Sequence, residues 1–540
     1  MDEADVVVIG AGHNGLVAAC HLARAGLRVC VLERRGQVGG GVVTEALTVP
    51  GFKHDTWSSG HPWLLTNPLL KHDELRLIEG GLRYVGHDPL LVLPLDDGRS
   101  LTIWRSAEKT AREIAHFSQA DAKRWRELGH WWGQVAHRHL MRVEHPAGQL
   151  PAPSAADEAL EREYLQIAAR SAVDVVMSNF ESEAVRAAAL WFAAVTVQPI
   201  DQPGSGLLPI AVPAGWAAYG WMNVVGGASM LADALAGELR AHGGEVQLNA
   251  AVQTIQPTTR GGHVVRHDQG LVHATRAVLA ATHFSQLVGM VGSDRLPPAF
   301  KQRVATWKSG PSLFVVHLAL PQNQQVRTAS GSVSAVLTGH ASVAGVVQQC
   351  VNVANHQLTR NDPYFLAACS SCIDPSRAPL GRGVLKLITS APYHLDGDAA
   401  NWDAAKSDYA DWLVEQYAGV VVNFKPGQEL GRFVQSPLDI ERANPSYHRG
   451  APQGGEMLPD QMGSNRPVVG YADYRSPIVG LYMTGVSTHP GGPVSGWPGR
   501  HAAQAILHDL GIPGATHARP GFTFSCPVID TTVSSVAIDN

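Results

Sequence analysis

Residues 6–26 read VVVIGAGHNGLVAACHLARAG, and this stretch decides the fold. The first residues form a short apolar run rich in valine, which is typical of a parallel strand buried on both faces. Gly10, Gly12 and Gly15 then form G-x-G-x-x-G, which allows a tight turn, a close backbone approach to a pyrophosphate and close helix–strand packing. The apolar stripe that starts at Asn14 predicts a helix to the end of the stretch.

A second strand and an acidic residue complete this unit. Residues 27–32 are mainly apolar and lead to Glu33, 18 residues after Gly15. A carboxylate about 20 residues beyond the glycine turn is typical of a group that binds ribose hydroxyls. The unit therefore predicts a dinucleotide site. Glu33 would repel a 2′-phosphate, which disfavours NADP, while NAD and FAD both stay open.

The next segment, RRGQVGGGVVTE, separates these two nucleotides. Gly39, Gly40 and Gly41 lie shortly after Glu33. A second glycine turn at this place lets another backbone segment reach the same pyrophosphate. The arrangement resembles the double-glycine signature of large FAD-binding oxidases, and nicotinamide dehydrogenases do not need it. We therefore favour FAD.

Composition excludes several other classes of protein. The length of 540 residues suggests two or more domains. Of these residues, 45% are hydrophobic and only 16% are charged. A net charge of -5 offers no basic field to nucleic acid or anionic lipid. No apolar run approaches the roughly 20 residues that span a bilayer, and no signal peptide is evident. We expect a cytoplasmic protein without nucleic-acid partners or a transmembrane segment. Peripheral membrane contact and the oligomeric state stay open.

The six cysteines do not form the dense framework of a disulfide-rich protein. Cys369 and Cys372 form a CxxC pair, but the sequence shows neither the basic neighbours of a redox pair nor the further ligands of a zinc site. A structural role is the favoured interpretation. No cluster of His, Cys and Asp stands out, so we expect no metal.

Two later segments look like the remaining parts of the nucleotide-binding sheet. The first has a helix after Gly226 and Gly227 and strand-like runs at 245–248, 251–255 and 274–284, and it would place Val252 beside the adenine. The second, residues 476–507, reads SPIVGLYMTGVSTHPGGPVSGWPGRHAAQAIL. It predicts a strand over 478–484 that Gly485 ends, then a loop rich in glycine and proline and a helix from about Gly499.

The loop and helix of this second segment suit a flavin ring. A helix N-terminus presents free amide groups and the positive end of its dipole, here to the electron-rich edge of the flavin. Glycines and prolines keep side chains away from a flat ring. The alternative is an ordinary surface loop, which rarely carries so many glycines and prolines between a buried strand and a buried helix.

Five motifs together resemble the phytoene desaturase-like FAD oxidoreductases, the family that includes carotenoid desaturases, retinol saturase and pyridine nucleotide-disulfide oxidoreductase domain-containing protein 2. They are GAGHNGL at 10–16, ERR at 33–35, GGGVVTE at 39–45, PGF at 50–52 and HPGGPVSGWPG at 489–499. The resemblance covers the cofactor-binding parts well and the middle of the chain poorly. Many relatives carry an Arg at the position of Gly41, where it reaches the cofactor, so their amine-oxidase chemistry does not transfer directly.

The motifs and the resemblance together predict which residues bind FAD. These are Gly10, Gly12, His13, Asn14, Gly15, Glu33, Arg34, Arg35, Gly39, Gly40, Gly41, Val43, Thr44, Val252, Gly485, Gly491, Gly492, Pro493 and Val494.

The expected fold is α/β, with an FAD-binding Rossmann-like domain of the glutathione-reductase and amine-oxidase type. Its three parts are residues 1–60, 220–292 and 470–513. The inserted substrate domain is mixed α+β and consists of the largely helical residues 61–219, with helices over 107–139 and 155–195, and of residues 293–469. Residues 514–540 would form a loose tail or a strap on the surface.

The chemistry belongs to the flavin, and the protein supplies position, electrostatics and exclusion of water. Six large apolar residues are candidates for a substrate slot over the ring, although they could equally fill the domain junction: Trp57, Trp63, Trp216, Trp221, Met222 and Trp497. His489 is the best candidate for a base or an orienting group, and a structural histidine is the alternative.

The sequence thus predicts an FAD-dependent oxidoreductase, either a dehydrogenase (desaturase) or an oxidase. Its substrate would be a lipophilic small molecule such as an isoprenoid or secondary metabolite, which loses or gains hydrogen at a C–C or C–heteroatom bond. No second G-x-G-x-x-G unit and no C-x4-C pair is found, so NAD(P)H oxidation and disulfide reduction are not expected. Electrons would pass to oxygen, a quinone or another acceptor. The alternatives are a non-redox polyene isomerase and a flavin-stabilised interaction protein.

Overall fold

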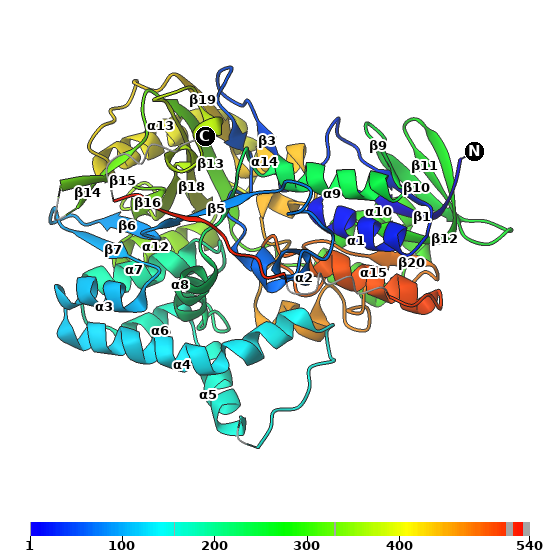
Figure 1. Cartoon of the computed structure of the whole chain (residues 1–540), viewed down its shortest axis with the longest axis horizontal. Helices are drawn as coiled ribbons and strands as arrows, with labels where there is room; N and C mark the ends of the chain where they lie inside the picture. The colour runs from blue at the N-terminus through cyan, green and yellow to red at the C-terminus, as the bar shows by residue number, and fades with distance from the viewer. Residues whose placement is uncertain (1, 156, 329–330, 515–521, 533–540) are drawn as a thin grey trace.

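The computed structural model describes residues 2–155, 157–328, 331–514 and 522–532. Two sheet-containing regions lie side by side, and the chain passes between them several times (Figure 1). One region holds the N-terminus, and the other holds a second large sheet flanked by helices. In the part of the chain that the structure describes, no helix combines the length and the apolar character needed to cross a membrane.

The first sheet assembles from three distant parts of the chain. Its strand order is β10-β11-β12-β1-β2-β9, and β20 pairs with β12. The central strand β1 runs parallel to β2 and to β12. The strands are β1 (Asp2–Ile9), β2 (Val29–Leu32), β9 (Glu245–Gln247), β10 (Val252–Pro257), β11 (His263–His267), β12 (Gly270–Ala280) and β20 (Leu481–Met483). This is the predicted Rossmann-like sheet.

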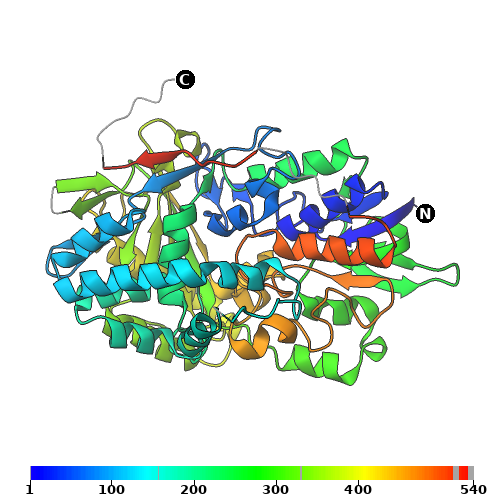
Figure 2. The same cartoon turned by 60° about the horizontal axis from the view of Figure 1, so that its bottom comes forward.

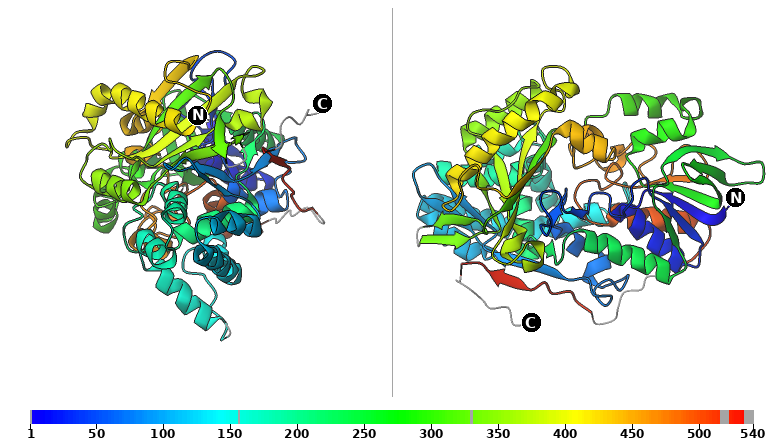
Figure 3. Two further views of the ribbon diagram at one scale, coloured as in Figure 1. Left: turned by 90° about the vertical axis from the view of Figure 1, so that its left-hand side faces the viewer. Right: turned by 90° about the horizontal axis from the view of Figure 1, so that it is seen from above.

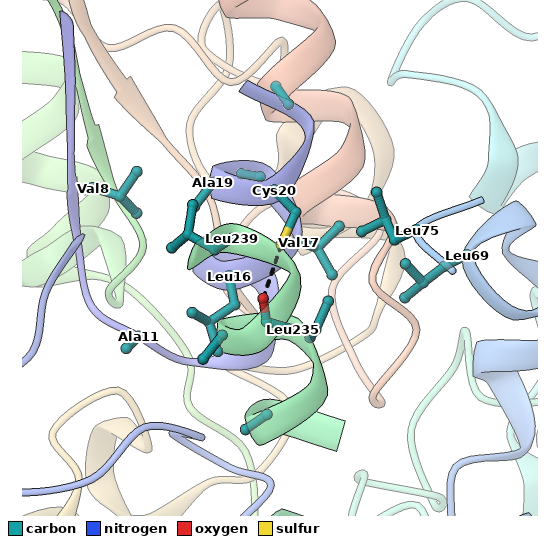
Figure 4. Close-up of a cluster of buried hydrophobic side chains, with 14 of the residues drawn as sticks. Val8, Ala11, Leu16, Val17, Ala19, Cys20, Leu69, Leu75, Leu235 and Leu239 are labelled. Atoms are coloured by element: carbon teal, nitrogen blue, oxygen red, sulfur yellow. Dashed lines mark hydrogen bonds between the residues drawn. The ribbon is translucent and has the colours of Figure 1, made fainter. Parts of the chain in front are cut away.

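Three helices pack beside this sheet: α1 (His13–Arg24), α9 (Ser229–Ala241) and α15 (Trp497–Asp509). Leu16 and Cys20 of α1 face Leu235 and Leu239 of α9 in a shared apolar cluster (Figure 4). The Cys20 thiol donates a hydrogen bond of 3.1 Å to the carbonyl oxygen of Leu235. Each fully buried leucine contributes about 1.5–3 kcal/mol, so this cluster holds the start of α1 firmly against the sheet.

The second large sheet has the order β19-β13-β18-β17-β16-β6-β7. Every residue of its strand β13 is buried. The strands are β6 (Leu91–Pro94), β7 (Ser100–Ile103), β13 (Ser312–Leu320), β16 (Leu337–His340), β17 (Phe365–Ala368), β18 (Gly383–Ala391) and β19 (Gly431–Gln435). The associated helices are α12 (Val343–Ala354), α13 (Trp402–Val420) and α14 (Pro437–Ala443).

A helical layer packs against this second sheet. It consists of α3 (Ala107–Ala115), α4 (Gln119–Glu144), α5 (Glu158–Ala168), α6 (Ala172–Asn179), α7 (Glu183–Ala194) and α8 (Leu208–Tyr219). The sequence predicted one helical stretch over 107–139. The structure has two helices there, because the Ser118 hydroxyl caps the amide of Asp121 at 3.0 Å and begins α4. Figure 2 shows that α4 extends across the molecule towards the C-terminal segment that precedes α15.

The remaining elements are short: β3 (Thr44–Glu45), β4 (His54–Asp55), α2 (Pro68–Lys71), β5 (Tyr84–Asp88), β8 (Asn223–Val224), α10 (Leu287–Val291), α11 (Pro298–Ala305), β14 (Gln325–Thr328), β15 (Gly331–Ser334) and β21 (Val528–Asp530). The tail segment 522–532 runs along the surface as a strap, because β21 pairs in parallel with β5 (Figure 3). Most of the predicted tail, residues 515–521 and 533–540, lies outside the described residues.

Candidate active site

The first glycine turn is shaped by two close backbone contacts. Gly10 has φ +102°, and a Cβ atom there would lie 3.0 Å from the carbonyl oxygen of Ala281. A Cβ atom on Gly15 would lie only 2.2 Å from the carbonyl oxygen of Gly10. These two glycines are therefore required by the turn itself, as the sequence predicted.

Gly12 is different because the space in front of it is open. A Cβ atom at Gly12 would meet only the Cα of Gly40, at 3.7 Å. Gly12 forms an isolated parallel bridge with Gly39, whose amide donates to the carbonyl of Ala11 at 2.9 Å. The two glycine turns therefore lie side by side, so both backbones can approach one ligand.

Glu33 ends β2 and points back to the first turn. Its buried carboxylate accepts hydrogen bonds from the amide of Ala11 at 2.8 Å and from the amide of Arg35 at 2.9 Å. These bonds hold one lone pair on each oxygen, and a carboxylate has about four such sites. Glu33 is thus oriented for hydroxyl donors from a ligand.

A cavity of about 260 Å³ lies over the two turns. Twelve of the predicted FAD-binding residues line it: Gly10, Gly12, His13, Asn14, Gly15, Glu33, Arg34, Arg35, Gly40, Gly41, Val252 and Gly485. Helix α1 begins at its edge with no side-chain cap, so amide groups are free for an anion. Open space before Gly12, free amides and an oriented carboxylate fit the ADP part of FAD.

Seven predicted FAD-binding residues lie outside this lining: four of them line the larger cavity described next, and Gly39, Val43 and Thr44 line neither cavity. Gly39 supports the second turn through its bond to Ala11. Val43 packs in an apolar cluster with Trp57. The hydroxyl of Thr44 donates to the Asp55 carboxylate at 2.7 Å. Their positions indicate that they hold the second glycine turn in place.

A larger cavity of about 700 Å³ adjoins the first, and its wall is mainly apolar. The lining includes Trp57, Trp63, Trp216, Trp221, His489, Gly491, Gly492, Pro493 and Val494, all of them predicted site residues. Two other substrate candidates lie elsewhere. Met222 is fully buried in the cluster around α1 and α9. The Trp497 indole donates to the Thr66 hydroxyl at 3.1 Å at the start of α15.

Four residues line both cavities: His13, Gly41, Tyr447 and Val486. A Cβ atom on Gly41 would lie 2.5 Å from the hydroxyl oxygen of Tyr447. The tyrosine hydroxyl therefore occupies the space that a side chain at position 41 would enter. The Tyr447 ring also packs against Trp57, with centroids 5.4 Å apart.

Burial raises the pKa of the Tyr447 hydroxyl above its usual range, so this group stays neutral at ordinary pH. Tyr447 could not be predicted from the sequence, because NPSYHRG around it matches no motif and its position depends on the approach of a distant segment.

His489 lies in the loop before α15 and is buried. Its Nε2–H donates to the carbonyl oxygen of His145 at the end of α4, with the two atoms 3.0 Å apart. This bond assigns the proton to Nε2 and leaves a lone pair on Nδ1. Burial lowers the pKa of His489 to about 4, so the ring is neutral at physiological pH.

Lys386 on β18 is the second residue that the sequence analysis missed. It lines the larger cavity, and its buried ammonium donates to the carbonyl oxygens of Asp55, at 3.1 Å, and Trp57. Burial lowers the pKa of Lys386 to about 8. The nearby carboxylate of Asp55 is paired with Arg377 at 2.9 Å. No local pattern marks a lysine within an apolar strand as a cavity residue.

Within the described ranges, no group of three or more His, Cys, Asp or Glu side chains is arranged to hold a metal ion.

Comparison with known proteins agrees with this geometry. The family model for flavin containing amine oxidoreductase matches residues 15–506. The chain is 29% identical to the rat (Rattus norvegicus) pyridine nucleotide-disulfide oxidoreductase domain-containing protein 2, covering 94% of each chain. It is 28% identical to one of the subunits of limonene dehydrogenase from Castellaniella defragrans, covering 94% of this chain and 95% of that one. The structure of cyclohexylamine oxidase from Brevibacterium oxydans is similar in fold, with a TM-score of 0.57, 16% identity, and coverage of 94% and 99%.

Proposed function

The chain belongs to the flavin-containing amine oxidoreductase family and is an FAD-dependent oxidoreductase of the phytoene desaturase-like branch, and on this premise we propose a more specific activity. The enzyme removes hydrogen from, or transfers it at, a C–C or C–heteroatom bond of a lipophilic small molecule such as an isoprenoid. FAD supplies the two-electron chemistry when it is bound. The electrons then pass to oxygen, a quinone or another acceptor.

One observation carries this proposal: the large, mainly apolar cavity joins the nucleotide cavity through the wall at Gly41, Tyr447 and Val486. An ADP group over the glycine turns would direct the rest of the cofactor towards this junction. A substrate in the larger cavity would then meet the flavin away from water. Ligand sites of this kind are mainly apolar and carry few, well-placed polar groups.

Trp57, Trp216 and Trp221 supply the apolar surface that would hold the substrate body. Trp216 and Trp221 pack against each other with centroids 4.5 Å apart, so this wall is rigid. A rigid wall limits the orientations of a bound molecule and brings one bond to the flavin. Size and apolar character select for a lipophilic substrate, in line with the name of the limonene dehydrogenase relative.

We assign an orienting role to His489. Its ring is fixed by the bond to His145, and it is neutral, so it contributes a weakly basic lone pair in an apolar wall. With its pKa lowered to about 4, proton abstraction is a poor task for this residue.

Anaerobic reduction tests the proposed function. The purified holoenzyme is mixed without oxygen with a panel of cyclic and linear isoprenoids, and the flavin absorbance is followed. At least one lipophilic donor should bleach the flavin, and reoxidation with oxygen or quinones then identifies the acceptor. Conversion of a polyene without any bleaching would instead support an isomerase. A flavin that no donor bleaches and that turns over nothing would support an interaction protein.

A further inference from the structure

A fully buried guanidinium lies behind the loop that precedes α15. Arg466 has no exposed surface. Its Nη1 donates to the carbonyl oxygens of Glu456 at 3.1 Å and Gln461 at 3.2 Å. Its Nη2 donates to the carbonyl oxygens of Gln453 and Val486, both at 2.7 Å. All four acceptors are neutral backbone groups.

The charge of Arg466 is not balanced by an acid. Among the described residues, its guanidinium bonds to backbone carbonyls and lies 5.4 Å from the centroid of the Trp307 ring, and the nearby charge that shifts its pKa is another cation, Arg303. Burial lowers the pKa of Arg466 to about 9, so the side chain is still largely protonated at neutral pH. A buried charge without a partner costs several kcal/mol. The four carbonyl bonds and the Trp307 ring offset part of this cost, but no opposite charge does.

The guanidinium lies directly behind the cavity wall. A Cβ atom on Gly491 would be 2.5 Å from Nε of Arg466, so only a glycine backbone separates the two. Nε itself is buried and has no hydrogen-bond partner among the residues that the structure describes. Gly491 lines the larger cavity, and Val486, which Arg466 also contacts, lines both cavities. The charge thus faces the junction through one layer of backbone.

We propose that Arg466 raises the reduction potential of the flavin by placing an uncompensated positive charge behind residues 486–491. This inference rests on the proposed position of the flavin at the cavity junction. Uptake of two electrons and one proton from the substrate leaves the reduced ring with a negative charge. A fixed cation in a water-free wall stabilises that charge without reorganisation. Arg466 is a positioning residue, because it acts through the loop and touches neither cofactor nor substrate.

The test compares midpoint potentials of holoenzyme variants, measured by equilibration with redox dyes. Arg466→Gln keeps hydrogen-bond donors and removes the charge. The midpoint potential should fall by about 30 mV for each tenfold decrease in the protein's preference for reduced over oxidised flavin. We expect at least a tenfold decrease. Arg466→Lys keeps the charge and should stay near the wild-type potential at neutral pH.

Arg303→Gln is the matched control. Arg303 also donates to backbone carbonyls, those of Pro467, Asp460 and Asn465, and like Arg466 it lies over the Trp307 ring. It is partly exposed, and the three atoms nearest to a Cβ on Gly491 all belong to Arg466 instead. Its replacement disturbs the same local packing without removing the buried charge, so the potential should not change. Equal shifts in the two Gln variants, or an equal shift in Arg466→Gln and Arg466→Lys, would overturn the proposal. So would an unchanged potential in Arg466→Gln.

If Arg466→Gln fails to bind FAD, the Lys variant decides. Lysine has a lower ordinary pKa than arginine and burial lowers both, so the Lys variant loses its charge at lower pH, and between neutral pH and about pH 10 its potential should fall more steeply with pH than that of the wild type. Curves of potential against pH that run parallel in the Lys variant and the wild type would contradict a role for the charge. Dye equilibration needs no substrate, so this result is independent of the search for a lipophilic donor. Failure of every donor would refute the proposed function and leave the role of Arg466 to be judged by the potentials.

Discussion

The two cavities meet at one wall but are built in different ways. The smaller one is formed mainly by backbone at the ends of β1, β2 and β12 and by the glycine turns after them. The larger one is formed by side chains from α4, α5, α8, β13, β17, β18 and the loops before α15. At Gly10 and Gly15 the first surface leaves no space for a side chain. The second surface consists largely of side chains, so their exchange would change which molecule fits.

The largest expected effects are at two glycines of the smaller cavity, Gly15 and Gly12, where the same substitution should have different consequences. Gly15→Val places atoms within 2.2 Å of the Gly10 carbonyl oxygen, so it should cost more than about 3 kcal/mol and prevent folding of the turn. Gly12→Val enters open space, so the apoprotein should fold while FAD is excluded. Thermal melting of the apoproteins and flavin content check both statements. Full flavin occupancy in Gly12→Val would contradict the assignment of this cavity to the nucleotide.

Glu33→Gln should weaken FAD binding. The carboxylate is held by the amides of Ala11 and Arg35 and has lone pairs left for ribose hydroxyls. Hydrogen bonds to a charged group contribute about 1.5–3 kcal/mol, so the dissociation constant should rise roughly 10- to 150-fold. Titration of apoprotein with FAD measures it. Trp63→Ala in the larger cavity is the control and should leave FAD affinity nearly unchanged, so equal losses would contradict the division between the cavities.

Acid should destabilise the protein through histidines buried behind the larger cavity. Burial lowers the pKa of His501 on α15 to about 3, and within the described part of the chain its ring nitrogens have no hydrogen-bond partner. Between this pKa and the unfolded value of about 6.5, the unfolded state binds more protons, so stability is lost as pH falls. The slope for one histidine is at most about 1.4 kcal/mol per pH unit.

His501→Gln should therefore reduce the slope of the unfolding free energy against pH between about pH 6.5 and about pH 3. The reduction should be the contribution of one histidine, at most about 1.4 kcal/mol per pH unit. His508→Gln removes a histidine at an exposed position on the same helix and serves as the control. Denaturant unfolding at several pH values measures the slope. The same slope in wild type and His501→Gln would show that His501 does not control acid stability.

The smallest expected effect concerns the junction. Gly41→Ala should cost about 1–3 kcal/mol, because its Cβ would lie 2.5 Å from the Tyr447 hydroxyl oxygen. Tyr447→Phe removes that oxygen, and the next nearest ring atom would be 3.4 Å away. The double variant should recover most of the loss, with a coupling of about 0.5–3 kcal/mol. Additive losses in a double-mutant cycle of thermal stability would show that the hydroxyl does not fill this position.

The two cavities also differ in how far the sequence predicts them. Gly10, Gly12 and Gly15 and the acid at Glu33 follow from backbone requirements that repeat at fixed spacing, so the sequence predicts both the strands and the lining. The fold class is confirmed, and the expected helix after the C-terminal loop begins at Trp497, two residues before Gly499.

The larger cavity depends instead on distant contacts that no local pattern shows. Tyr447, Lys386 and Arg466 reach the site only because β18 and the segments around 447 and 466 pack against the N-terminal turn and the loop before α15. The aromatic residues predicted from the sequence include Trp57 and Trp216, which line the larger cavity, and Trp497, which does not line it and donates to Thr66.

Anaerobic stopped-flow absorbance of the flavin tests the central claim most directly, namely that reducing equivalents come from a molecule in the larger cavity. The holoenzyme is mixed in turn with NADH, NADPH and the panel of lipophilic donors, and Trp216→Ala is measured in parallel. The account predicts that a lipophilic donor bleaches the flavin, more slowly in the variant, and that neither nicotinamide nucleotide does so at a comparable rate. Rapid bleaching by NADH or NADPH, with no response to any lipophilic donor, would contradict it.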